Sequence, residues 1–225
     1  MAPKAKAPPA KQLQVVLVED HRMFREWLGR MICEDASLTV CGEADNIKDA
    51  LSVIQRTQPD IVLLDITLRD SSGLELLKDM RALEIEVPVL VLSMHDPGFY
   101  AERAFRAGAR GYISKHAASS TLLKAMRQIL AGETYLDEQI ASTLVGKLFK
   151  PGARKAGLDS LADRELEVLQ FIGKGLTTRE IARRLSLGET TVETYRARIK
   201  EKLGLRSAAE VYLKAGQWVK EQGLS

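Results

Sequence analysis

The sequence predicts two domains: an α/β domain built on a parallel sheet, followed by a smaller all-α domain. Up to residue 131, short apolar runs rich in β-branched residues alternate with longer amphipathic stretches. After residue 157 only amphipathic patterns remain, and a basic segment interrupted by Pro and Gly, residues 150–157, separates the two parts. The length of 225 residues fits two domains of ordinary size.

The strands of the first domain are predicted from runs that are nearly continuous in apolar residues, which is typical of parallel strands covered on both faces. They are Val15–Val18, Leu38–Cys41, Ile61–Leu64, Val89–Leu92 and Gly111–Ile113. Helices are predicted between and after them, where apolar residues recur every three or four positions, at 21–33, 46–57, 72–83, 98–107 and 118–131. This order predicts a doubly wound (βα)₅ sheet with right-handed crossovers and functional residues at the carboxyl ends of its strands.

The second domain is predicted to consist of four helices, at 162–173, 178–185, 189–203 and 207–221. Thr177 and Glu189 stand where the second and third of these begin, because small polar or acidic residues favour the exposed amides of a helix start. Residues 137–149 read as a lone amphipathic helix. The predicted organisation is therefore a disordered basic tail (1–12), the α/β domain (13–136), a linker with a helix (137–157) and the helical domain (158–225).

Charge is distributed unevenly along the chain. Residues 13–137 carry 14 basic and 19 acidic side chains, whereas residues 158–225 carry 12 and 10, within a net charge of +3. The split suggests that the second domain meets a polyanion, although a solvated helix surface would look similar. The longest apolar runs are too short to span a membrane, and no secretory signal precedes the first strand. We therefore expect a cytoplasmic protein with no membrane partner and with reduced Cys33 and Cys41.

Acidic residues follow two strands that are neighbours in such a sheet. Glu19 and Asp20 come directly after the first strand and Asp65 directly after the third, so their carboxylates are expected to converge on one crevice. An oxygen-only cluster of this kind suits Mg²⁺. Ser93 and Lys115 end the fourth and fifth strands and add a hydroxyl and an ammonium to the same rim. Together these groups predict a phosphoryl-handling site with Asp65 as nucleophile.

These residues resemble the receiver domain of two-component response regulators, with spacings of 45, 28 and 22 residues from Asp20 through Asp65 and Ser93 to Lys115. The resemblance covers residues 13–131. It implies a flavodoxin-like fold, phosphorylation of Asp65 by a sensor histidine kinase and slow self-dephosphorylation without dedicated enzyme activity. It also implies Mg²⁺ held by Glu19, Asp20, Asp65 and the backbone carbonyl of Thr67, and a switch formed by Ser93 and Tyr112. The sequence departs from the family at Leu68 and Arg69, where Met-Pro is usual.

Residues 175–195 read as helix, tight turn, helix, with Ile181, Ala182 and Leu185 on the buried face of the first helix. On the next helix a stripe of Val192, Tyr195, Ile199 and Leu203 is predicted to face the core. The segments Leu161–Glu165, Glu180–Ala182 and Lys202–Gly204 resemble the LuxR-type helix-turn-helix, and the whole chain resembles the NarL/FixJ class of response regulators. This resemblance implies that the third helix reads double-stranded DNA and that the fourth often forms a dimer contact.

Base-reading positions on the third helix are expected to be Glu193, Thr194 and Ala197, a set without the Lys or Arg that would bind guanine. Phosphate contacts are expected from basic and hydroxyl side chains around them. The predicted DNA-binding residues are Thr178, Arg179, Thr191, Glu193, Thr194, Arg196, Ala197, Arg198 and Lys200, with Lys174 as a further phosphate contact. We expect salt-sensitive DNA binding of modest specificity, by a homodimer.

The sequence thus predicts a transcription factor that phosphorylation switches. We expect the unphosphorylated first domain and linker to hinder the third helix or its pairing, and phosphorylation to draw Ser93 and Tyr112 inward. A phosphorylation-independent regulator that uses the first domain as a dimerisation scaffold is the main alternative. An enzyme with an aspartyl-phosphate intermediate and a four-helix protein-interaction module are others. His21 and His95 are interpreted as solvated residues, although the resemblance places Thr67 and His95 beside Asp65.

Overall fold

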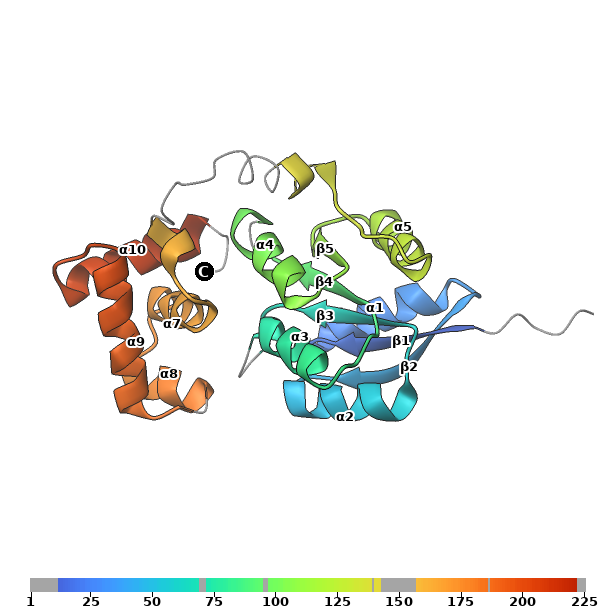
Figure 1. Cartoon of the computed structure of the whole chain (residues 1–225), viewed down its shortest axis with the longest axis horizontal. Helices are drawn as coiled ribbons and strands as arrows, with labels where there is room; N and C mark the ends of the chain where they lie inside the picture. The colour runs from blue at the N-terminus through green and yellow to red at the C-terminus, as the bar shows by residue number, and fades with distance from the viewer. Residues whose placement is uncertain are drawn as a thin grey trace, which may run out of the picture.

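The structure is a computed structural model that describes residues 12–68, 72–94, 97–138, 140–142, 157–185 and 187–221. Two domains are seen in Figure 1, an α/β domain coloured blue to green and a helical domain coloured orange to red. The predicted tail lies outside the described residues except for Gln12, as does most of the predicted linker. Among the described residues no helix is long and apolar enough to cross a membrane.

The first domain is built on a five-stranded, all-parallel sheet with the strand order β2-β1-β3-β4-β5, which confirms the predicted doubly wound sheet. Its strands are β1 (Leu13–Val18), β2 (Leu38–Ala44), β3 (Ile61–Asp65), β4 (Val89–Ser93) and β5 (Gly111–Ser114). Each predicted strand is present, and the observed strands extend beyond the apolar runs by up to three residues. Polar residues such as Asp65 and Ser93 therefore belong to the strand ends, where ladder hydrogen bonds fix their backbones.

Five helices cover the two faces of this sheet: α1 (Arg22–Cys33), α2 (Ile47–Thr57), α3 (Gly73–Ala82), α4 (Pro97–Ala107) and α5 (Ser119–Leu130). Strand side chains alternate between the faces, as the pleat requires. Val16, Val62 and Val91 pack with α2, α3 and α4, whereas Leu17 and Leu63 pack with α1 and α5. This two-sided burial explains why the strand segments read as continuous apolar runs.

The second domain contains a 3₁₀ turn (Gly157–Ser160) and four helices, α7 (Asp163–Gly173), α8 (Thr178–Arg184), α9 (Glu189–Lys202) and α10 (Ala208–Glu221). The four helices agree with the predicted ranges to within a residue at each end. The side chain of Thr177 accepts a hydrogen bond from the Glu180 amide, and Glu180 accepts one from the Thr177 amide, so this predicted helix start is confirmed as a capping box. Val192, Ile199 and Trp218 are buried at its centre.

Helices α7 and α10 approach each other so closely at Gly173 that no larger residue fits. A Cβ at this position would lie 2.4 Å from the Ala215 carbonyl oxygen and 2.5 Å from Val219 Cγ2. Because the first of these atoms belongs to the backbone of α10, a side chain at position 173 would push the helix itself.

We expect Gly173→Ala to lower the free energy of unfolding of the second domain by about 1–3 kcal/mol, since α10 must shift to accept the methyl group. A urea titration followed by the fluorescence of the buried Trp218 measures this. Gly216→Ala on α10 is the matched control, because nothing lies within 4 Å of its Cβ position. That variant should be neutral or stabilised by up to about 1 kcal/mol; equal effects of the two changes would contradict the packing argument.

Candidate functional site

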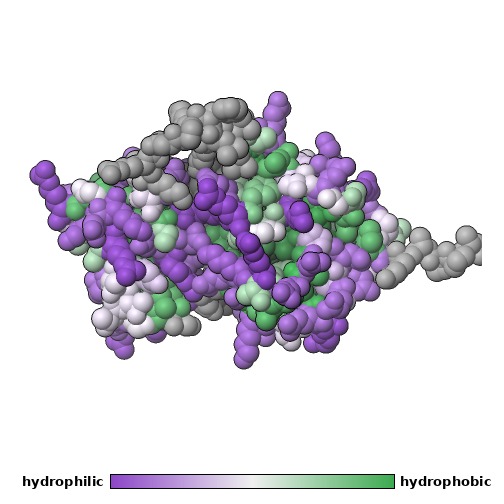
Figure 2. Space-filling view, viewed as in Figure 1, coloured by the Kyte–Doolittle hydropathy of each residue, from purple (hydrophilic) through white to green (hydrophobic). Residues whose placement is uncertain are grey.

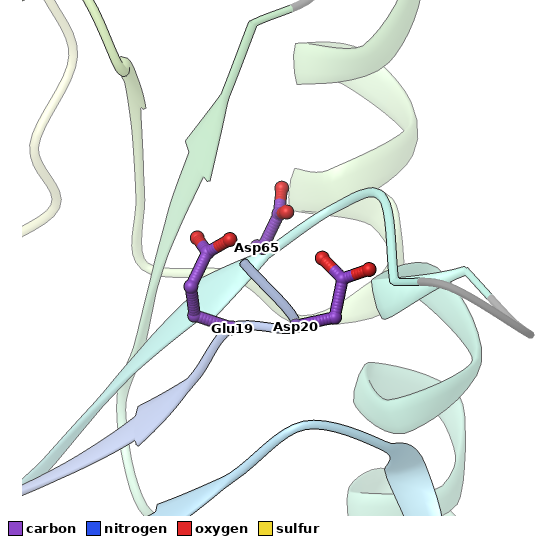
Figure 3. A group of neighbouring side chains, drawn as sticks. All are labelled: Glu19, Asp20 and Asp65. Carbon is purple, nitrogen blue, oxygen red and sulfur yellow. The ribbon is translucent and has the colours of Figure 1, made fainter. Parts of the chain in front are cut away.

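Three carboxylates converge at the carboxyl edge of the sheet. Glu19 and Asp20 follow β1 and Asp65 ends β3, and one carboxylate oxygen from each lies within 4.8 Å of the others. Figure 3 shows the three side chains rising from two neighbouring strands toward the same space. Glu19 and Asp65 are buried, whereas Asp20 is half-buried. The crevice predicted from the two strand ends is therefore present.

Lys115, just after β5, neutralises part of this acidic cluster. Its Nζ donates hydrogen bonds to Glu19 Oε2 at 2.6 Å and lies 2.8 Å from Asp65 Oδ2. The Lys115 side chain is only 9 % exposed, so the two ion pairs are poorly screened by water. The backbone amide of Lys115 donates to the Ser93 carbonyl at 2.8 Å, which fixes the lysine relative to β4.

Burial and neighbouring charges shift the ionisation of this cluster. Burial raises the pKa of Asp65 to about 7; the adjacent Glu19 also raises it, and Lys115 opposes the rise. Burial disfavours the charged form of Lys115, but the attraction of Asp65 and Glu19 outweighs it and raises the lysine pKa. Lys115 pairs with two of the three carboxylates, which leaves an excess of negative charge that an additional cation would balance.

The donor set fits a hard divalent cation such as Mg²⁺, which prefers a few carboxylate oxygens and keeps several waters. Asp20, outside the Lys115 ion pairs, is the most exposed of the three acids. Thr67 lies beside the cluster, because its backbone amide donates to Asp65 Oδ1 at 3.1 Å. Its carbonyl as a fourth ligand remains a prediction.

Ser93 and Tyr112, the predicted switch pair, are both completely buried. Tyr112 packs in the cluster on the α2–α4 side of the sheet, near the ring of Tyr100 from α4. Both side chains thus lie inside the domain in this structure, and their movement on phosphorylation stays a prediction. His21 is exposed, in agreement with its interpretation as a solvated residue, and His95 lies outside the described residues.

The predicted DNA-reading helix is α9. Val192 and Ile199 are buried and Tyr195 and Leu203 half-buried, so the predicted core stripe is confirmed. The outward face is exposed to solvent at Thr191, Glu193, Thr194, Ala197, Arg198 and Lys200. Figure 1 shows α7 between α9 and the sheet, so the first domain does not cover this face of α9. The expectation that the first domain and linker hinder the third helix or its pairing stays a prediction.

Three of the predicted DNA contacts bind one another instead of pointing freely outward. The Thr178 hydroxyl donates to Glu193 Oε1 at 2.6 Å, and Arg196 Nη1 donates to Thr178 Oγ1 at 2.8 Å. Arg196 also lies over the Tyr212 ring of α10, with its Cζ 5.0 Å from the ring centroid. Arg179 is largely exposed, 4.0 Å from Glu189.

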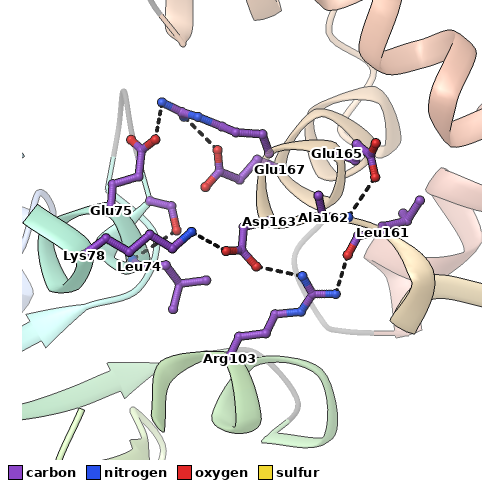
Figure 4. A network of polar contacts seen from close by, with 11 residues as sticks. Leu74, Glu75, Lys78, Arg103, Leu161, Ala162, Asp163, Glu165 and Glu167 are labelled. Atoms are coloured by element: carbon purple, nitrogen blue, oxygen red, sulfur yellow. Dashed lines mark hydrogen bonds and ion pairs between the residues drawn. The ribbon is translucent and has the colours of Figure 1, made fainter. Parts of the chain in front are cut away.

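The two domains are joined by a polar contact that we call the α7 clamp, formed by Asp163 with Lys78 and Arg103 (Figure 4). Asp163, the first residue of α7, accepts hydrogen bonds from Lys78 of α3 at 2.5 Å and Arg103 of α4 at 2.7 Å. Arg103 also donates to the Leu161 carbonyl at 2.7 Å. Although burial favours the neutral carboxyl, these hydrogen bonds lower the pKa of Asp163. One carboxylate thus holds two helices of the first domain.

Beside the clamp, α7 covers the segment that follows Asp65. Arg164 bridges Glu75 of α3 at 2.5 Å and Glu167 of its own helix at 2.8 Å. Burial raises the pKa of Glu167, and Arg164 opposes that rise. A small cavity between the domains is lined by Ile66, Thr67, Leu68, Ser72, Tyr100, Glu167, Gln170, Phe171 and Leu185. On the face in Figure 2, hydrophilic side chains gather along the junction of the domains, which agrees with a polar contact.

One lysine of the second domain is influenced by the charge of the acidic cluster. Lys174, at the C-terminal end of α7, was expected to hold a DNA phosphate. Burial and the charge of Arg184 lower its pKa, while attraction to Asp20 of the first domain opposes this. The interdomain residues Asp163, Lys78 and Arg103 were not singled out from the sequence, because each reads as an ordinary surface charge.

A receiver-type acidic site joined to a helix-turn-helix defines a class of two-domain signalling regulators, and similarity to known proteins agrees with it. The "Response regulator receiver domain" family model matches residues 15–127, and that of the "Bacterial regulatory proteins, luxR family" matches residues 159–215. The chain belongs to the response regulators that join a receiver domain to a LuxR-type DNA-binding domain, and it functions in transcriptional control.

Relatives along most of the chain agree with this assignment. The response regulator GacA of Pseudomonas aeruginosa is 34 % identical over 203 residues, which span 90 % of this chain and 95 % of GacA. The DNA-binding transcriptional activator DevR/DosR of Mycobacterium tuberculosis is 33 % identical over 202 residues, 89 % of this chain and 93 % of the relative. The fold resembles that of RcsB from Salmonella typhimurium, with a TM-score of 0.70 over 93 % of this chain and 99 % of RcsB at 19 % identity.

We expect Asp65→Asn to stabilise the protein in metal-free buffer at pH 8 but not at pH 4. Because burial raises the folded-state pKa of Asp65 to about 7, the wild type loses stability as pH rises from the unfolded-state value of 3.8 through 7. The uncharged amide avoids this loss, which amounts to about 2–4 kcal/mol for a shift of this size. Urea titrations at the two pH values measure the difference.

The control for this prediction is Asp79→Asn, which changes an exposed acid on α3. Its effect should stay within about 0.5 kcal/mol at both pH values. If Asp65→Asn lowers the free energy of unfolding at pH 8, the ionised Asp65 carboxylate does not destabilise the fold and the prediction is wrong.

Proposed function

We propose that Asp65 accepts a phosphoryl group from a sensor histidine kinase and that this modification loosens the α7 clamp, which lets two DNA-binding domains pair on a promoter. The observation that carries the proposal is the buried cluster of Glu19, Asp65 and Lys115 beside the segment that α7 covers. We further propose that the protein acts in the cytoplasm, where kinase and DNA are both accessible.

In the transfer step, a carboxylate oxygen of Asp65 forms a bond to phosphorus while the bond from phosphorus to the donor's imidazole nitrogen breaks, leaving an acyl phosphate. Lys115 is placed to contact the phosphoryl oxygens as a cation, and Ser93 to donate from its hydroxyl. Glu19, Asp20, Asp65 and the Thr67 carbonyl would hold Mg²⁺, which supplies neutralisation of the transferring oxygens. Water later hydrolyses the acyl phosphate slowly, so the chain is a switch and no dedicated enzyme.

The structure offers two routes from Asp65 to the clamp. Helix α3, which carries Lys78, follows the segment after Asp65, and α4, which carries Arg103, follows Ser93. A dianionic phosphoryl group on Asp65 attracts Lys115 and the Ser93 hydroxyl. It therefore displaces the residues that lead from β3 into α3 and from β4 into α4. Because Asp163 depends on both cations, a small displacement of either helix weakens its hold on α7. This route is proposed beside the expected movement of Ser93 and Tyr112.

On DNA we propose that α9 enters the major groove, with Thr194 and Ala197 at base edges and Thr191, Arg198 and Lys200 at phosphates. Arg179 would hold a phosphate from α8. The α10 residues Tyr212 and Leu213 are exposed large hydrophobic side chains, 41 % and 75 % exposed, and would form the contact of a homodimer. Two such domains would bind half-sites about one helical turn apart.

We expect the full chain, incubated with Mg²⁺ and a small-molecule phosphodonor, to gain one phosphoryl mass in intact mass spectrometry. Asp65→Asn should gain none, and Asp79→Asn should gain it as the wild type does. A phosphoryl mass that persists in Asp65→Asn would refute the assignment of the acceptor. Equal DNA affinity with and without the donor would instead favour the phosphorylation-independent regulator.

We expect Asp163→Asn to separate the domains without phosphorylation, because a neutral amide loses its attraction to Lys78 and Arg103. A loss of about 1–2 kcal/mol is expected for a partly buried pair of this kind, which is roughly a tenfold gain in the open population. Small-angle scattering should show a larger radius of gyration, and DNA affinity should rise. Asp79→Asn, with the same charge change on α3, should behave like the wild type; an unchanged Asp163→Asn radius would refute the clamp.

A further inference from the structure

An acidic side chain, Glu193, stands on the outward face of the DNA-reading helix. Its side chain is 59 % exposed and close to the basic groups that a DNA backbone would contact. A carboxylate at this place repels phosphate unless it reads a cytosine amine or has another role. The hydrogen bonds around it indicate another role.

Glu193 is held by two donors from different parts of the domain. The Thr178 hydroxyl of α8 donates to Glu193 Oε1 at 2.6 Å. Arg196, one turn along α9, has its Nε 3.9 Å from the same oxygen, and its Nη1 donates to the Thr178 hydroxyl at 2.8 Å. A hydroxyl and a guanidinium therefore converge on one anionic oxygen.

The donors are more firmly placed than the acid. The Arg196 side chain is only 13 % exposed, and the Tyr212 ring, 5.0 Å from its Cζ, supports the guanidinium from behind. Thr178 is half-buried at the start of α8. The exposed Glu193 side chain can instead rotate into water. The Thr178–Arg196 pair thus remains in place when its anion leaves.

We propose that Thr178 and Arg196 form a binding site for one phosphate of the DNA backbone, and that Glu193 occupies this site in the free protein. Carboxylate and phosphodiester oxygens accept hydrogen bonds from the same hydroxyl and guanidinium donors. The pair also bridges the two helices of the helix-turn-helix, where a DNA strand passes. The proposal rests on the DNA-binding function and assigns Glu193 a role other than base reading.

The consequence is a lower affinity for every DNA sequence, by the same factor. A phosphate that enters the site expels a carboxylate of the protein, so this contact exchanges one anion for another. An ordinary phosphate contact adds about 0.9 to the slope of log K against log salt. In the wild type this phosphate contact adds less affinity than an ordinary one. Discrimination between DNA sequences then depends on the residues that touch bases.

The test is DNA affinity of the full chain, measured by fluorescence polarisation at several salt concentrations. One duplex has a mixed sequence, and the other has A·T pairs alone, so that it offers no cytosine amine to Glu193. The proteins are wild type, Glu193→Gln, Thr178→Val, the double variant Thr178→Val/Glu193→Gln, and the control Glu201→Gln. Glu201 is an exposed acid on the same helix, so the control makes the same charge change away from Thr178.

We expect Glu193→Gln to tighten binding about 3- to 10-fold on both duplexes and to steepen the salt slope by about one unit. Glu201→Gln should change affinity less than twofold, and Thr178→Val should remove most of the gain in the double variant. Equal gains from Glu193→Gln and Glu201→Gln, or weaker binding by Glu193→Gln, overturn the proposal while leaving DNA binding intact. Absence of binding by the wild type to every duplex overturns the DNA-binding function itself.

Discussion

The ion pairs of Lys115 with Glu19 and Asp65 determine how the rest of the molecule is arranged. Three strand ends must stay in register for these groups to meet, because Lys115 supplies the positive charge that compensates both buried carboxylates. The pairs do not neutralise the cluster, since Asp20 adds a third carboxylate. The ion pairs thus hold the carboxyl edge of the sheet together. Its charge is not balanced, so a bound cation or a phosphoryl group changes the electrostatic energy of the cluster.

The contact between the domains has a different character, because exposed ion pairs accompany a small apolar contact around Tyr100 and Phe171. Lys78 and Asp163 are 54 % and 25 % exposed, and exposed ion pairs contribute little individually. The Asp163 carboxylate binds α3 and α4 at once, so it fixes the position of α7 but contributes little free energy. Such an interface is suited to reversible opening, whereas an extensive apolar interface would fix the domains permanently.

Much of this structure could be predicted from the sequence. Buried parallel strands need apolar side chains on both faces, and the sheet geometry then brings acids at two strand ends together whatever their distance in sequence. The clamp could not be predicted, because Lys78 and Arg103 stand 85 and 60 residues from Asp163 and each has the pattern of a solvated helix face. Helical periodicity also places Glu193 and Arg196 outward, but it does not determine which rotamers turn them toward Thr178. The sequence also does not show that the first domain packs against α7 and leaves α9 uncovered.

Arg196 contacts both the reading surface and the helix that carries the exposed Tyr212. A guanidinium that takes part in both contacts makes them thermodynamically linked, since a shift that improves one changes the free energy of the other. Linkage of this kind is reciprocal: in the proposed homodimer, the factor by which DNA binding strengthens pairing through Tyr212 equals the factor by which pairing strengthens DNA binding. Cooperative occupation of adjacent half-sites would then be a property of the second domain alone, present even without the receiver.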